Sequence, residues 1–223
     1  MLIDGVDPHA RPGGRDEIRL RIGFTFQFPE EQFLRETVKE EFADVMRLRG
    51  ISPADCAERM HRALEAMGLD PAGIAERSPF SLSLGESRRL ALALVLAIAP
   101  AAALLDEPTS GLDARGCACA LTAIGSLRRS GATVVIATHD VDLLAEVAGR
   151  VLILGEGGIE SDGEADETLT DGGLLKRYGY SLPEVVSTAA VLRVGGRLDG
   201  RPVLRLKELI ERAGGSGERR ASE

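Results

Sequence analysis

Lysine is scarce in this sequence, which has only Lys39, Lys176 and Lys207 among its 223 residues. None of the three follows a glycine or precedes a serine or threonine. The chain therefore contains no Gly-x-x-x-x-Gly-Lys-Ser/Thr loop, the motif whose backbone amides and lysine cradle phosphate groups. Acidic residues outnumber basic ones by 35 to 27, and the formal net charge is −8. Because nucleic-acid-binding surfaces usually carry a basic excess, this charge excludes nucleic acid as an expected partner.

Cysteine and long apolar runs are scarce as well. The chain has three cysteines and no signal peptide, which indicates a reducing cytoplasm rather than a disulfide framework. The longest apolar run, residues 90–105, has 16 residues and contains Pro100, whereas a membrane-spanning helix needs about 20 uninterrupted ones. We therefore expect a buried helix, a turn at Pro100 and a strand in this run, and only peripheral contact with a membrane.

The stretch 82–113 carries the strongest local patterns, beginning with a predicted helix start. Ser83 is followed three residues later by Glu86, and this capping-box spacing predicts that a helix begins there. The free backbone amides and positive dipole end of such a helix make an anion site. Arg88 and Arg89 come next, and we interpret them as side chains that cover the helix surface.

A predicted strand with two carboxylates at its end completes this stretch. Residues 101–105 form a short apolar run, as expected of a buried parallel strand. Asp106 and Glu107 stand where that strand ends, which is the place where ligands gather in open α/β sheets. One carboxylate can hold Mg²⁺ while the next polarises a water molecule.

The rest of the chain alternates between predicted strands and helices. An alternating pattern predicts a strand over 19–26 that leads to Gln27, and Ser52 with Pro53 predicts a second helix start. Gly68 is expected to end that helix. The other expected elements are a helix from Asp113 to about Arg129, a strand Thr133–Ala137 that presents His139, a hairpin of 150–154 with 158–160, and a helix Leu206–Arg212.

Five short motifs resemble, in order and spacing, those of the ATPase subunits of ABC transporters. They are Gln27 for the Q-loop, 82–86 for the LSGGQ signature, 105–107 for the end of the Walker B strand, 110–113 for the D-loop and 138–140 for the H-loop. The segment Gln-Phe-Pro-Glu at 27–30 resembles more specifically the Q-loop of energy-coupling factor (ECF) transporter ATPases, the importers of vitamins and metal ions.

The resemblance implies ATP and Mg²⁺ as cofactors and assigns catalytic roles. Asp106 and Gln27 would hold Mg²⁺, and Glu107 would act as general base toward the attacking water. His139 would contact and sense the γ-phosphate. Gln27 would also count among the catalytic residues, because it would contact Mg²⁺ or water, and it would couple the site to the membrane subunit.

The resemblance also implies a nucleotide-binding set on the signature helix. Ser83 and the Gly85 amide would bind the γ-phosphate of a nucleotide held by the opposite subunit, with Glu86 at the position of the signature's glutamine. Asp113 would be both a helix cap and a contact across the dimer. Leu84 replaces the signature's first glycine, and its side chain narrows the approach that glycine would allow.

For the fold, the resemblance implies an α/β, P-loop NTPase-like ABC ATPase domain with a helical subdomain and a small C-terminal extension. The ATPase domain would cover 1–180 without its P-loop, and the helical subdomain about 30–88. Residues 181–212 resemble the extension through which ECF ATPases dimerise, and 213–223 are expected to be a disordered tail. Because 1–5 resemble the strand that the family's P-loop precedes, we expect a domain truncated at its N-terminus.

The implied function is that of an ATP-binding and ATP-hydrolysing subunit of an ECF-type importer of vitamins or metal ions. It would lie peripherally at the cytoplasmic face of the cell membrane. Its partners would be a second ATPase subunit, a membrane coupling protein and a substrate-binding membrane protein. Without a P-loop, the isolated chain is expected to be inactive and to need an intact partner subunit for turnover.

Alternative interpretations remain open at this point. The chain can be a non-catalytic, degenerate or regulatory subunit, or a gene fragment of a full-length ATPase. A soluble ABC ATPase of the chromosome-maintenance kind would also share these motifs. That class needs a long heptad-bearing arm between Gln27 and Ser83, and the intervening stretch is far too short for one.

Overall fold

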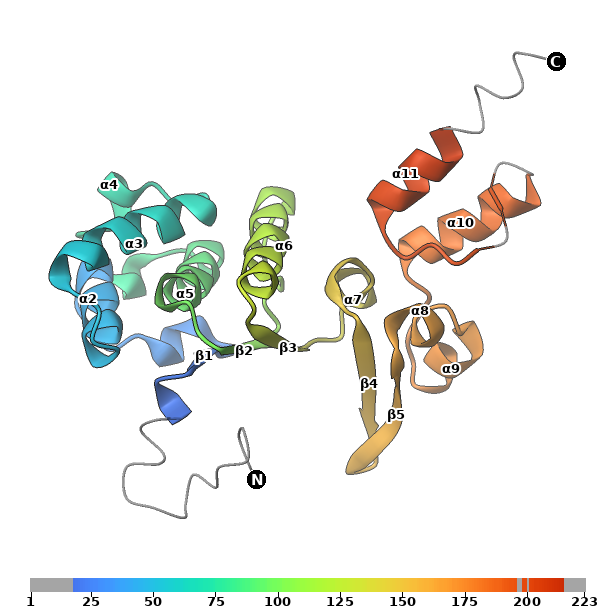
Figure 1. Ribbon diagram of the computed structural model, residues 1–223, viewed down its shortest axis with the longest axis horizontal. Helices are drawn as coiled ribbons and strands as arrows, with labels where there is room; N and C mark the ends of the chain where they lie inside the picture. The colour runs from blue at the N-terminus through green and yellow to red at the C-terminus, as the bar shows by residue number, and fades with distance from the viewer. Residues whose placement is uncertain (1–17, 196–197, 200, 215–223) are drawn as a thin grey trace. The chain divides into compact units, whose positions relative to one another are not determined.

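The computed structural model describes residues 18–195, 198–199 and 201–214 (Figure 1). The chain divides into two compact units, one ending at Thr138 and the other beginning at His139, and each is described by itself. The strand expected at 1–5 and residues 215–223 of the expected tail lie outside the described residues.

A three-stranded parallel sheet organises the first unit (Figure 1). Its strands lie in the order β1 (Ile22–Thr25), β2 (Ala102–Asp106) and β3 (Thr133–Ala137). Thr25 lies beside Leu105, and Leu105 lies beside Ile136. All three carboxyl ends therefore meet at one edge, the edge at which open α/β sheets bind their ligands.

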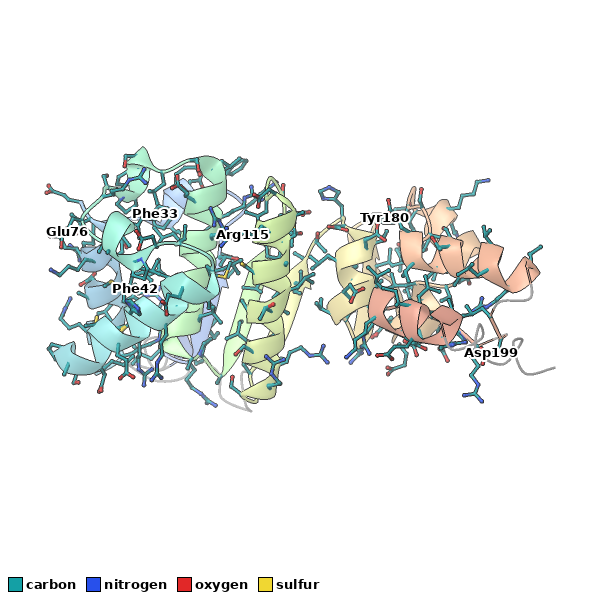
Figure 2. All side chains as sticks on the ribbon, turned by 90° about the horizontal axis from the view of Figure 1, so that it is seen from above. Phe33, Phe42, Glu76, Arg115, Tyr180 and Asp199 are labelled. Atoms are coloured by element: carbon teal, nitrogen blue, oxygen red, sulfur yellow. The ribbon has the colours of Figure 1, made fainter. Side chains whose placement is uncertain are left out.

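Helices make up the rest of the first unit. They are η1 (Pro29–Gln32), α2 (Val38–Leu48), α3 (Pro53–Ala66), α4 (Pro71–Ile74), η2 (Pro79–Ser81), α5 (Leu84–Ile98) and α6 (Ala114–Arg129). Phe42 of α2, Leu64 of α3 and Leu90 of α5 are fully buried where these helices pack together. Figure 2 shows Phe33 and Phe42 within this helical part. The core of the unit is thus largely helical, with one face of the sheet closing it.

Local sequence signals set where these helices begin and end. The Thr37 hydroxyl accepts a hydrogen bond from the Glu40 amide, and the Glu40 carboxylate accepts one from the Thr37 amide, so α2 begins with a capping box. Ser52 caps α3, with Pro53 at its first position, and Gly68 follows the helix with a φ of +66°. The predicted start and end of α3 are therefore confirmed.

The apolar run folds as its composition predicts. Helix α5 ends at Ile98, Ala99 takes a left-handed conformation with φ of 44°, and β2 begins two residues after Pro100. Nine residues of α5 are buried, so this helix lies inside the unit. Over the ranges that the structure describes, the helices are too short or too polar to span a lipid bilayer.

The two faces of the sheet have different surroundings. Helices α5 and α6 cover one face (Figure 1), and α5 approaches β1 so closely that a Cβ at Gly23 would lie 2.9 Å from Val95 Cγ1. The other face carries Phe24, Leu104 and Val135 side by side across the three strands. Phe24 is 45% and Val135 53% exposed, so the described part of the first unit leaves this apolar row open.

Strand β1 is shorter than the predicted 19–26, which is a correction. Ile18 and Arg19 form a helical turn, and pairing with β2 begins only at Ile22. At the other end, the Phe26 amide donates to Gln32 Oε1 (3.2 Å) instead of continuing the ladder. The half-buried Arg49 closes the amino end of β1, because its Nη2 donates to the carbonyls of Ile22 (2.7 Å) and Arg19 (3.4 Å).

The second unit is built around an antiparallel hairpin of β4 (Arg150–Gly155) and β5 (Gly158–Glu164), as predicted. Arg150 and Asp162 form a two-pronged ion pair across it, with both N–O distances at 2.6 Å. Its helices are α7 (Val141–Val147), α8 (Ala165–Thr168), α9 (Gly172–Arg177), α10 (Glu184–Val194) and α11 (Leu206–Gly214). The inward side chains of the hairpin pack with α8 and α9, and α10 packs on α11. The helix predicted at 206–212 is confirmed and runs on to Gly214. Residues 213–214, which were expected to begin the disordered tail, are therefore helical, which is a correction.

Candidate functional site

The carboxyl ends of the three strands bring four predicted elements of the site to one edge. Gln27 follows β1, Asp106 ends β2, Glu107 follows it, and Thr138 follows β3. The Asp106 amide donates to Thr25 Oγ1 (3.3 Å), which joins the ends of β1 and β2. We call residues 26–28 the β1 loop and 107–113 the β2 loop.

Glu107 is held in an unusual backbone conformation. Its φ is +44°, and a residue other than glycine in the left-handed region costs about 1–3 kcal/mol unless its surroundings enforce it. The Glu107 amide donates to the Ala137 carbonyl (2.9 Å). Thr138 Oγ1 donates to the Glu107 carboxylate (2.9 Å). The backbone and the carboxylate of Glu107 are thus both held in place by the end of β3.

The interpretation of Arg88 as a side chain that covers the helix surface is wrong, because Arg88 is buried. The residue is 8% exposed. Its Nη1 donates to the Glu107 carbonyl and its Nη2 to the Gln27 carbonyl, each at 3.0 Å. A signal was available in the sequence: the segment of α5 that follows is apolar on all sides, and such helices are buried.

Arg89 also reaches backbone carbonyls rather than only covering the surface. Its Nη1 donates to Met67 (3.3 Å) and Gly68 (3.0 Å), and its Nε donates to Gly85 (3.3 Å). The last carbonyls of a helix lack intrahelical donors. Arg89 therefore ties the end of α3 to the first turn of α5, which carries the signature.

The signature residues form the predicted capping box at the start of α5. The Glu86 amide donates to Ser83 Oγ (3.3 Å), and the Ser83 amide donates to Glu86 Oε2 (2.9 Å). Ser83 Oγ also lies 2.8 Å from Glu86 Oε2. Arg77 Nη1 pairs with the other carboxylate oxygen of Glu86 at 3.3 Å. Glu86 therefore holds the cap in this structure, and its carboxylate faces Ser83 and Arg77.

This cap makes the stability of α5 depend on pH. Hydrogen bonds from Ser83, with a smaller contribution from Arg77, lower the pKa of Glu86 below its usual value. A depressed folded-state pKa stabilises the protein above the usual carboxylate pKa of about 4.3 and loses that contribution as pH falls through the lower value. We expect Glu86→Gln to cost about 0.5–1 kcal/mol at pH 7.

Urea unfolding of wild type and Glu86→Gln at pH 7 and at about pH 3 checks this prediction. The difference between the two midpoints should shrink as the pH falls through the lowered pKa of Glu86, since the protonated side chain and the glutamine of the variant are both uncharged. A difference that is equal at both pH values would show that the Glu86 charge does not stabilise the cap.

The signature and the β2 loop lie against each other. A Cβ on Gly111 would lie 3.4 Å from Leu84 Cδ2, and one on Gly85 would lie 3.9 Å from the Gly111 carbonyl oxygen. Gly111 has a φ of +71°, where a side chain is strained in any case. Asp113 Oδ1 accepts from the Gly116 amide (2.7 Å) and caps α6, as predicted. Leu84 is 52% exposed, so it rests on Gly111 and still faces solvent.

The first unit thus unites all the predicted site residues except one. Gln27, Asp106 and Glu107 share the strand-end edge. Ser83, Gly85 and Glu86 share the start of α5, where Gly85 lies near the β2 loop that leads to Asp113. His139 opens the second unit, directly before Asp140, the cap of α7. The role of His139 toward the γ-phosphate stays a prediction.

The donor set fits a magnesium ion only if a nucleotide supplies further ligands. Within the described ranges, no three His, Cys, Asp or Glu side chains lie together as a metal cluster. Mg²⁺ is usually bound by one or two carboxylates together with water and phosphate oxygens. Asp106, half-buried at the strand end, would supply one such carboxylate. For phosphate, the chain offers the start of α5 but no P-loop lysine.

Known proteins match this sequence and fold. The family model described as ABC transporter matches residues 1–110. The energy-coupling factor transporter ATP-binding protein EcfA2 of Symbiobacterium thermophilum is 40% identical over 196 residues, which cover 88% of this chain and 68% of that protein. The EcfA2 protein of Clostridium perfringens is 34% identical over 197 residues, or 88% of this chain and 69% of that one.

Solved structures of ABC ATPases have a similar fold. The protein cbiO1 from Clostridium perfringens, described as part of the ABC transporter complex cbiONQ, superposes with a TM-score of 0.64 at 26% identity over 79% of this chain and 70% of its own. A dimeric ATP-binding cassette in a post-hydrolysis state, bound to ADP and Pi, gives 0.65 at 25% identity over 74% and 72%. With a relative 40% identical across two thirds of its length, the chain belongs to the family of ABC transporter ATP-binding proteins.

Proposed function

We propose that the chain is the ATP-binding subunit of an ECF-type importer of a vitamin or a metal ion. It works in a dimer with a second ATPase subunit that has a P-loop. The EcfA2 relatives and the cbiO1 likeness support this proposal. The observation that carries it is the fully capped signature helix, packed on the β2 loop, in a unit that also presents Asp106 and Glu107 at its strand ends.

In this proposal the two subunits contribute different parts of one nucleotide site. The partner's P-loop holds ATP, while this chain presents Ser83, Gly85 and Asp113 to the same nucleotide. The amides at the start of α5 and its positive dipole end stabilise the γ-phosphate charge. Bound ATP with Mg²⁺ would supply the phosphoryl group that is hydrolysed. At this chain's own strand edge, Asp106 and Gln27 would hold Mg²⁺ only together with a nucleotide, whose phosphate oxygens supply further ligands.

Exposed apolar side chains beside the β1 loop support docking on a membrane coupling protein. Phe28 is 51%, Leu34 78% and Phe80 61% exposed, and Phe80 packs edge-on against Phe33 with ring centroids 6.5 Å apart. Such clustered exposure is typical of interaction surfaces. A substrate-binding membrane protein would complete the importer, and the chain would sit peripherally at the cytoplasmic face of the membrane.

In the second unit, the exposed Val191, Val194 and Ile210 support the proposal that 181–212 is a dimerisation extension. These side chains lie on α10 and α11 at 72%, 92% and 63% exposure. Residues 1–180 would then be the ATPase domain, with its helical subdomain at about 30–88.

Nucleotide binding by the purified chain tests the need for a partner. Losing roughly four P-loop hydrogen bonds, at about 1.5–3 kcal/mol each, removes about 6 kcal/mol or more, or roughly 10⁴ in affinity. The chain alone should therefore show no rise in melting temperature with millimolar MgATP. A mixture with an intact ATPase subunit should hydrolyse ATP. A clear shift with the chain alone would show that other residues replace the P-loop.

A non-catalytic or regulatory subunit is the second candidate. Leu84 favours it, since a half-exposed leucine stands where the signature has glycine and limits the approach of a phosphate. The rate of ATP hydrolysis by the mixed complex separates the two candidates. Ser83→Arg should abolish it if this chain contributes its signature to the site, and should leave it unchanged if the chain is a regulatory subunit.

A further inference from the structure

A single buried guanidinium links the two strand-end loops to the signature helix. Arg88 projects from the second turn of α5, and its two terminal nitrogens donate to the carbonyls of Gln27 and Glu107, each at 3.0 Å. These carbonyls are far apart in the sequence and belong to the β1 and β2 loops. Backbone pairing joins the strands only up to Thr25 and Leu105. Beyond that point, the Asp106 amide and Arg88 hold the two strand ends together.

The surroundings of Arg88 show that it is not an ordinary surface arginine. The residue is 8% exposed, and its Nε is buried with no hydrogen-bond partner in the described structure. Buried polar atoms are nearly always paired. The position of the guanidinium satisfies the two carbonyls and leaves the Nε donor without a partner. The two carbonyls therefore determine where the guanidinium lies.

We propose that Arg88 is a positioning residue that makes the β1 loop, the β2 loop and the start of α5 move as one body. Each carbonyl fixes one loop to the same planar group, and that group is attached to the helix whose first turn holds Ser83 and Gly85. A displacement of the β1 loop, for example on docking to a partner, is passed to Glu107 and to the signature together. Neither the motifs nor the comparisons assign this role.

Arginine is required for this link because of its shape. The guanidinium presents its donors in a rigid planar fork, whereas a lysine ammonium is a single point on a flexible stem. Arg88→Lys keeps the charge and most of the apolar stem, but its single ammonium cannot meet both carbonyls in the geometry of the planar fork, so both hydrogen bonds weaken. The loops should then move independently.

Arg49, at the C-terminal end of α2, supplies a matched control in the same unit. It too reaches two backbone carbonyls, those of Arg19 and Ile22, and its Nε is also buried without a partner in the described structure. Its carbonyls lie at the amino end of β1, opposite the strand-end loops. Arg49→Lys should therefore remove a similar contact without touching the link.

Hydrogen exchange of the full chain tests the link without reference to activity. Arg88→Lys is expected to speed amide exchange by about tenfold in both loops at once, since each loses a hydrogen bond from a charged group. Arg49→Lys should change exchange only around 19–23. The proposal is overturned if Arg88→Lys leaves either loop unchanged, or if Arg49→Lys loosens the loops equally.

ATP hydrolysis in the complex with an intact partner subunit gives a second readout, which rests on the proposed function. Arg88→Lys should lower kcat about tenfold and leave KM for ATP within about twofold, because the partner holds the nucleotide and this chain acts on the transition state. Arg49→Lys should keep kcat within about twofold at a similar loss of melting temperature. Equal kcat for both variants would overturn the role. If wild type hydrolyses no ATP, the proposed function fails and hydrogen exchange alone decides the link.

Discussion

Ser83→Arg should abolish ATP hydrolysis by the complex of this chain with an intact ATPase subunit, with a loss of at least about a hundredfold. Ser83 caps α5, and a large side chain there would occupy the space that the partner's γ-phosphate needs. In the same complex, Glu107→Gln should change the rate by less than about twofold. Glu107 would serve a site in which no P-loop holds ATP.

Steady-state phosphate release from the reconstituted complex measures both variants. Ser126→Arg is the matched control, since Ser126 is an exposed serine of α6 remote from the cap, and it should leave the rate unchanged. If Glu107→Gln is instead the damaging change, a P-loop holds ATP beside this chain's own carboxylates. The proposal that only the partner subunit provides a P-loop is then wrong.

Gly23→Val should destabilise the first unit by about 3 kcal/mol, at the upper end of the range for overpacked cores. A Cβ at Gly23 would lie 2.9 Å from Val95 Cγ1 and 3.0 Å from Pro100 Cγ. Both neighbours are fixed, one within the buried helix α5 and the other in a ring between α5 and β2. The sheet and α5 would have to separate, and β1 would lose its place beside β2.

Urea unfolding followed by circular dichroism measures this change. Gly125→Val is the control within the same unit, because its Cβ would meet only the flexible end of Arg129, at 3.1 Å. Its effect should stay within about 0.5 kcal/mol. Equal effects of the two variants would mean that α5 can move away from β1 at little cost.

The sequence predicted those features of the fold that are local. The capping box joins Ser83 and Glu86, which are three positions apart, and Asp113 caps the Gly116 amide at the same separation. Their hydrogen bonds need no tertiary information, so they were found from spacing alone. The strands β2 and β3 were also found, because short apolar runs bounded by turn residues are typical of buried strands.

Contacts between distant segments could not be predicted in the same way. Nothing near Arg88 in the sequence shows that carbonyls from positions 27 and 107 meet at its side chain. The left-handed Glu107 is likewise set by β3, which supplies both the Ala137 carbonyl and Thr138. The extent of β1 depended on the reach of Gln32, a side chain six residues away. Each of these is a property of the assembled unit.

Because the described part of the first unit leaves the row of Phe24, Leu104 and Val135 open, association of two copies through this row should depend on ionic strength. Two copies that approach by these faces gain from apolar contact only at short range. The formal charge of −8 repels them over a longer distance, about 30 Å in 0.01 M salt but only about 10 Å in 0.1 M salt. Added salt therefore shortens the repulsion and leaves the attraction in place, so self-association through this row, wherever the row stays open, is expected to rise with salt.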